Sequence, residues 1–302
     1  MRVKNTRLFV FVAQPEPGIY EVVTNANRGI QVMLLTERIV KLAGMLALAG
    51  MAQFICFTGI AMLKYGGGTQ LDAKSSGFSL TQNFLDDLGR REAYSARPNG
   101  MAANLFGCGG TLAGLLLIPF FLVLPAHAPE SGLMLRIAGA CGVLAALALI
   151  AVALLPGDMH PAGHSMAMQA FAGGLFAVAA CHAAALFMSD DGSLFLSVAS
   201  IFLSLTLFVT MLTSFSVGSD NFTNEEAAMQ GVQLSRPEVS LAHAVTSQKV
   251  IVGSVMLWLL ATNTWTAFVY RTVAAKEKPQ KSIRGWLGRA QKKLVKLNER
   301  HL

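Results

Sequence analysis

The residues best suited to chemistry lie in short polar stretches between long apolar runs. Asp158, His160 and His164 fall close together in LLPGDMHPAGHSMAMQ. If a helix starts early enough there, with Pro161 in its first turn, the four-residue spacing puts both imidazoles on one face. Two such imidazoles can share a zinc ion, with Asp158 as a third ligand or as the group that orients one ring. Alternatively, these residues cap the helix and contact interfacial water.

A second pair of carboxylates, Asp86 and Asp87, lies in SLTQNFLDDLG. Asp-Asp before Leu-Gly either caps a helix or closes a turn, or directs one carboxylate into a bundle mouth as a ligand or general base. His243, near Gln248 and Lys249 before the last apolar run, could complete a site with these groups. We therefore predict as catalytic residues Asp86, Asp87, Asp158, His160 and His164. The predicted metal ligands are His160, His164, His243 and Asp158.

The sequence does not identify a cofactor: zinc is one candidate, and copper and haem are less favoured. Met159, Met166 and Met168 accompany the two histidines, and thioethers favour copper(I), although an apolar helix start also contains methionine. Haem needs two imidazoles at one depth on facing helices. Only the outward-facing group of His160, His164 and His243 could offer them, and that group also carries carboxylates. His182 lies far from it, roughly 27 Å beyond His164 along a helix, and is predicted to serve helix packing.

The composition shows which elements must position these residues. The chain has 302 residues, of which 53% are hydrophobic and 14% are charged, which excludes an ordinary soluble enzyme. Apolar runs long enough to cross a bilayer recur six times. The predicted spans are residues 39–63, 101–124, 133–155, 165–188, 194–215 and 250–270. Their many small residues favour close helix packing, and their four cysteines have no metal-like spacing.

We predict an all-α polytopic membrane protein, a six-transmembrane-helix bundle with a cytoplasmic N-terminal segment and a C-terminal amphipathic helix. The predicted domains are residues 1–38, 39–271 and 272–302. No cleavable signal peptide is expected, because LFVFVA is short and runs into QPEPG. RLFVFVAQ, PEPG and IYEVV together suggest a small β-hairpin.

Basic residues flank the first and last spans, which favours cytoplasmic termini in a plasma (inner) membrane. Residues 271–302 carry ten basic and two acidic residues, a formal charge of +8, so the rest of the chain carries −1. The loops 64–100, 156–164 and 216–249 then face outward, and the predicted chemistry lies on that side.

The basic tail itself is predicted to form an interfacial helix. Its apolar residues recur at three- and four-residue steps between Ile283 and Leu297, and basic residues occupy the other faces. Such a helix lies on anionic lipid headgroups. A docking helix for a membrane-protein partner is the alternative, and nucleic acid is not an expected partner.

Two of these motifs resemble a known family. NFLDDLG, residues 83–89, is similar to the SDLG loop of the six-span prokaryotic family called domain of unknown function 998. LPGD, residues 155–158, followed by His160 or His164, is similar to its P-x-D…H segment. More distantly, the chain resembles the Frag1/DRAM/Sfk1 group, some of whose members are linked to lipid remodelling. This chain has Asp86 where serine is usual, a longer N-terminus and the basic tail. The resemblance implies a fold and topology, and no activity.

Three functions fit this sequence. An enzyme could use the Asp/His site to activate water against a lipid or lipid-linked substrate, with or without zinc. A non-catalytic subunit or scaffold could dock a partner through the N-terminal segment and the tail. A transporter of a small solute or of a metal such as copper could use the same groups, although no predicted span interior carries the acidic or basic residues usual at mid-depth.

Overall fold

The computed structural model describes residues 17–127, 132–188, 193–210 and 244–268. The chain forms two compact units, Met1–Ile39 and Val40–Leu302, and the candidate site lies in the second. Helix α1 covers Pro17–Lys64. The predicted hairpin is therefore wrong in its second half, because IYEVV is helical. Residues 1–16 lie outside the described residues.

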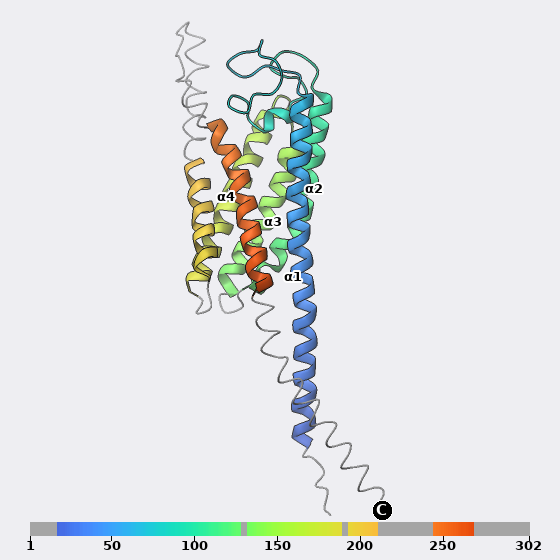
Figure 1. Ribbon diagram of the computed structural model, residues 1–302, viewed down its shortest axis with the longest axis vertical. Coiled ribbons are helices and arrows are strands. Elements are labelled where there is room, and N and C mark those ends of the chain that lie inside the picture. The colour runs from blue at the N-terminus through green and yellow to red at the C-terminus, as the bar shows by residue number, and fades with distance from the viewer. Residues whose placement is uncertain (1–16, 128–131, 189–192, 211–243, 269–302) are drawn as a thin grey trace, which may run out of the picture. The chain divides into compact units, whose positions relative to one another are not determined.

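The second unit is a helical bundle (Figure 1). Within the described ranges, α1 is followed by α2 (Gly100–Val123), α3 (Gly132–Leu154), α4 (Pro161–Phe187) and two further helices, Leu194–Thr210 and Ala244–Phe268. The helix Ala244–Phe268 is the last one described, and we call it the last helix. Two short 3₁₀ helices, η1 (Asp86–Gly89) and η2 (Leu124–His127), lie between them. In the described ranges, the only β-type pairing is an isolated bridge between Glu92 and Pro98.

Within the described ranges, five helices are long and apolar enough to cross a membrane, which supports an integral membrane protein. They are Glu37–Lys64, Gly100–Ala126, Gly132–Leu154, Pro161–Phe187 and Ala244–Phe268. They correspond to the predicted first, second, third, fourth and sixth spans. The predicted fifth span is helical over Leu194–Thr210, and its remainder lies outside the described residues. So does the predicted amphipathic tail.

Small residues allow the helices to approach closely, as the sequence predicts. A Cβ atom added to Gly142 of α3 would lie 2.2 Å from the Phe121 ring of α2. A Cβ added to Gly114 of α2 would lie 2.7 Å from the carbonyl oxygen of Ala146 on α3. Larger side chains at either glycine would push α2 and α3 apart, so these glycines allow the close approach of the two helices.

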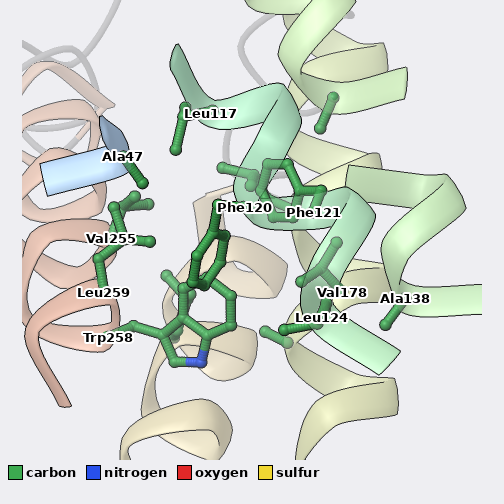
Figure 2. Packing of buried hydrophobic residues seen from close by; sticks show 14 of the residues in the cluster. Ala47, Leu117, Phe120, Phe121, Leu124, Ala138, Val178, Val255, Trp258 and Leu259 are labelled. Carbon is green, nitrogen blue, oxygen red and sulfur yellow. The ribbon is translucent and has the colours of Figure 1, made fainter. Parts of the chain in front are cut away.

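The bundle core is aromatic as well as aliphatic (Figure 2). Trp258, from the helix Ala244–Phe268, meets Phe120 of α2 edge to face, with ring centroids 5.7 Å apart. Phe121 lies beside Phe120. This cluster joins α2 to the helix Ala244–Phe268.

A structured loop, residues 65–99, connects α1 to α2 at one end of the bundle (Figure 1). Asn99 holds its ends together, since its Oδ1 accepts from the Gly66 N–H at 3.2 Å and its Nδ2 donates to the Arg90 carbonyl at 2.9 Å. Gly68 has a φ of +84°, and a Cβ there would lie 2.5 Å from the Ser95 nitrogen. Only glycine fits this crossing of two backbone segments.

Candidate functional site

Asp87 shapes the turn that carries both predicted loop carboxylates. Its Oδ2 accepts hydrogen bonds from the Phe84 N–H at 2.8 Å and from the Asn83 side-chain amide at 3.2 Å. Asn83 in turn donates to the Gly68 carbonyl at 3.1 Å. These bonds hold η1 as a tight turn, and Asp87 is only 6% exposed. The turn-closing role considered for the Asp-Asp pair is therefore met by Asp87.

Asp86 points the other way, toward α4, and pairs with His164. Its Oδ2 lies 2.9 Å from His164 Nε2. The other ring nitrogen, Nδ1, lies 2.7 Å from the Leu155 carbonyl oxygen. Because a carbonyl and an ionised carboxylate can only accept, both contacts are hydrogen bonds when the imidazole carries two protons. His164 is then a cation fixed between two acceptors, and its ring also lies 3.6 Å from the position of a Cβ on Gly157.

The start of the last helix completes the cluster. The Gln248 amide donates to Asp86 Oδ1 at 2.7 Å, and its carbonyl oxygen accepts from the Leu85 N–H. The Lys249 ammonium donates to the Asn83 carbonyl at 2.8 Å and to the Val245 carbonyl at 3.1 Å. Gln248 and Lys249 were not predicted as site residues. The sequence signal that could have identified them is their position at the polar start of an apolar helix.

We call the group Asn83, Asp86, Asp87, His164, Gln248 and Lys249 the carboxylate cluster. It joins the loop, α4 and the last helix, and lies where two of the candidate spans begin. Its two carboxyl groups differ in acidity. Burial raises the pKa of Asp86, but the hydrogen bond and charge of His164, together with the Gln248 amide, outweigh burial and leave the pKa below its usual value.

The neighbouring Asp87 is shifted in the opposite direction. Burial and the adjacent Asp86 charge raise its pKa to about 6, against smaller lowering effects from Asn83, the Phe84 N–H and the Tyr94 hydroxyl. Tyr94 hydrogen bonds to this carboxyl group, and burial and the Asp87 charge raise the pKa of its phenol. The Arg90 guanidinium lies 4.3 Å above the Tyr94 ring centroid. Adjacent carboxyl groups with opposite pKa shifts form a potential acid–base pair.

The other predicted site residues lie apart from this pair. Asp158 Oδ2 accepts from the backbone N–H groups of Arg91 at 2.8 Å and Glu92 at 3.0 Å. Asp158 therefore fastens the loop, and Asp86 is the carboxylate that contacts His164. The role of Asp158 as a metal ligand or as an orienting group stays a prediction. His160 is the exposed residue preceding α4 and makes no side-chain capping hydrogen bond. His243 lies outside the described residues.

The zinc prediction gains no support from the described part of the chain. No group of three or more His, Cys, Asp or Glu side chains there could hold a metal ion. Both nitrogens of His164 already have partners, so a metal on this ring would have to displace Asp86 or the Leu155 carbonyl. The shared site of His160, His164, His243 and Asp158 stays a prediction, as do copper and haem.

Comparisons with protein-family models, curated proteins and solved structures found no match to this chain. The resemblance to domain of unknown function 998 and the Frag1/DRAM/Sfk1 group stays a prediction. The carboxylate cluster thus has to be interpreted from its own geometry.

Proposed function

We propose that this membrane protein uses the carboxylate cluster as an acid–base site for a lipid or lipid-linked substrate. The observation that carries the proposal is the pair Asp86 and Asp87, adjacent in sequence and shifted in opposite directions. Asp86 stays ionised beside His164, whereas the pKa of Asp87, about 6, lets it take up and release a proton near neutral pH. A general acid or base works best with its pKa near the operating pH.

The location of the cluster supports an amphiphilic substrate. His164 and Gln248 lie within the first turns of two helices long enough to span a membrane. Such positions meet the headgroup region of a bilayer, where a lipid can enter sideways. In this scheme Asp87 moves the proton, the Asp86–His164 pair supplies a fixed dipole, and the Lys249 ammonium stabilises developing negative charge. The scheme replaces the metal-bound water considered for His160 and His164 with a carboxyl group as base.

A scaffold is the second candidate, because the protein itself binds the polar groups of the cluster. Both His164 nitrogens and both Asp86 oxygens have protein partners. Such a cluster could fasten the loop to the bundle without reacting with any substrate. The basic tail and the N-terminal segment would then be the docking surfaces, and the membrane the location.

One experiment separates the two. Purified protein is incubated in bilayers of a total lipid extract from its source cells, and products are identified by mass spectrometry. The enzyme proposal expects products that Asp87→Asn abolishes and that the matched loop variant Asp72→Asn, at an exposed position, retains. Because asparagine resembles the protonated carboxyl group, Asp87→Asn preserves the fold. Products that persist in Asp87→Asn would overturn the role of Asp87, and no products from any lipid class would favour the scaffold.

A further inference from the structure

A second polar group lies deep inside the bundle, at the other end of α4 from the loop. His182 of α4 and Ser200 of the helix Leu194–Thr210 are fully buried, and Trp258 of the last helix is 1% exposed. Figure 2 shows the Trp258 indole beneath Phe120, inside the hydrophobic core. We call His182, Ser200 and Trp258 the buried trio. It joins three helices through side-chain hydrogen bonds within the bundle.

Ser200 is at the centre of these bonds. Its Oγ lies 2.9 Å from His182 Nδ1 and 2.9 Å from the Leu196 carbonyl oxygen. The Trp258 indole N–H donates to the same Oγ at 3.1 Å and also points at His182 Nδ1 at 3.3 Å. The imidazole and indole rings meet edge to face, with centroids 5.4 Å apart.

A serine hydroxyl has one proton and two lone pairs, so this arrangement has two satisfied states. In the first state Ser200 donates to an unprotonated Nδ1 of His182. In the second, Nδ1 carries a proton and donates to Ser200, whose own hydroxyl turns to the Leu196 carbonyl. The indole N–H keeps Ser200 as its acceptor in both states. Rotation about one bond thus accommodates a proton gained or lost at Nδ1.

We propose that the buried trio is a proton-binding site within the bundle. The proton comes from water and returns to it, and His182 is the group that holds it. An ionisable side chain within membrane-spanning helices is costly, and such residues mark ion pathways and proton relays. A purely structural bridge would need only an amide or a hydroxyl. The trio adds the span-interior protonatable group that the sequence alone did not assign to function.

The packed elements carry few other titratable groups. On the described helices of the second unit, the first three helices carry lysine, arginine and cysteine only: Lys41, Cys56 and Lys64 on α1, Cys108 on α2, and Arg136 and Cys141 on α3. Besides His182, α4 carries His164 and Cys181, and the helix Ala244–Phe268 carries Lys249. The helix Leu194–Thr210 contributes none. Cys181 is adjacent to His182 in sequence. Asp190 and Asp191 follow α4 and lie outside the described residues. His182 is thus the only imidazole that these helices place at this end of α4.

Trp258 provides a direct probe. A protonated imidazole quenches a neighbouring excited indole more strongly than a neutral one. In the full chain with Trp265→Phe and Trp286→Phe, Trp258 is the only tryptophan. In lipid nanodiscs titrated from about pH 9 to about pH 4.5, we expect its fluorescence to fall in a single one-proton transition. His182→Gln should remove the transition, and His160→Gln, at the exposed position preceding the same helix, should leave it.

Ser200→Ala gives a finer test. Without the hydroxyl, a proton on Nδ1 has no acceptor, so the midpoint should fall by about one pH unit, a tenfold weaker proton affinity. A flat titration, or one that persists in His182→Gln, would overturn the proposal.

A second measurement covers the case in which His182→Gln fails to fold. Nitrogen-15 NMR is recorded on protein in which glutamine replaces His127, His160, His243 and His301. Two imidazoles then remain, and His164→Gln identifies the signals of His182. Nitrogen shifts of His182 that do not change over the same pH range would equally overturn the proton site.

Discussion

The two histidines of α4 occupy opposite environments. His164, near the start of the helix, lies between a carboxylate and a carbonyl oxygen, which can only accept hydrogen bonds. His182, near the end, faces a serine hydroxyl and an indole N–H, and the hydroxyl can donate or accept. Fixed acceptors hold one protonation state, whereas an adaptable partner permits two. The hydrogen-bond partners of the ring nitrogens, and not the depth of the residue in the bundle, therefore determine which protonation states a histidine in an apolar helix can adopt.

The largest expected effect comes from breaking the fixed pair. His164→Ala leaves Asp86 mostly buried with the Gln248 amide as its remaining side-chain partner, because the imidazole contact is lost. Removing one member of a buried pair costs about 3 kcal/mol or more. We expect the free energy of unfolding, measured by denaturant titration in micelles, to fall by about that amount. A loss below about 1 kcal/mol would show that the pair does not hold the loop to the bundle.

The second prediction concerns Asp87 and pH. Its pKa is raised to about 6 in the folded protein, from 3.8. The folded state therefore binds the proton more tightly than the unfolded state, and this stabilisation is present below about pH 4 and lost as pH rises to about 6. Relative to Asp87→Asn, the wild type should lose on the order of 3 kcal/mol of stability across that interval. Parallel pH profiles for the two proteins would contradict the raised pKa.

Asp86 should show the opposite sign. Its pKa is lowered in the folded state, so its contribution to stability is present at neutral pH and lost as the pH falls below about 4. In the Asp87→Asn background, where the neighbouring titration is gone, acidification below that value should destabilise the protein, and Asp86→Asn should weaken this response. Thermal unfolding followed by circular dichroism would measure both, and a response unchanged by Asp86→Asn would assign the acid lability to another carboxyl group.

In the buried trio, the expected stability effect is smaller. Ser200→Ala removes a neutral acceptor from the Trp258 N–H and a partner from His182, and neutral hydrogen bonds contribute about 1 kcal/mol each. We expect a loss of about 1–2 kcal/mol, with Ser204→Ala on the same helix as the matched control. A loss equal to that of His164→Ala would mean that the buried trio contributes as much to the free energy of unfolding as the Asp86–His164 pair.

His160→Ala should have the smallest effect. The side chain is exposed and makes no capping hydrogen bond, so the change in unfolding free energy should stay within about 0.5 kcal/mol. A larger loss would show that His160 has a role within the cluster, and would revive the predicted pairing of the two histidines at the start of α4.

The sequence predicted the spans better than the contacts between them. Five helices agree with predicted spans, because long apolar runs have few alternatives. The predicted N-terminal hairpin is wrong in its second half because α1 begins at Pro17, whose ring already fixes the φ that the first turn of a helix needs. Proximity in sequence favours Asp158 as the partner of an imidazole. The carboxylate that contacts His164 is Asp86, 78 residues away. Nothing local indicates which of several distant aspartates a folded loop will deliver.

The hydrogen bond between Gln248 and Asp86 spans 162 positions of the chain. The loop is synthesised early and the helix Ala244–Phe268 late. The hydrogen bond from the Gln248 amide to Asp86 therefore cannot form until that helix has been made. Contacts of such long sequence separation form late in folding. The carboxylate cluster is therefore a test of completed assembly: a chain truncated before the last helix would have an unfinished loop, exposed to proteases in a way that the finished protein is not.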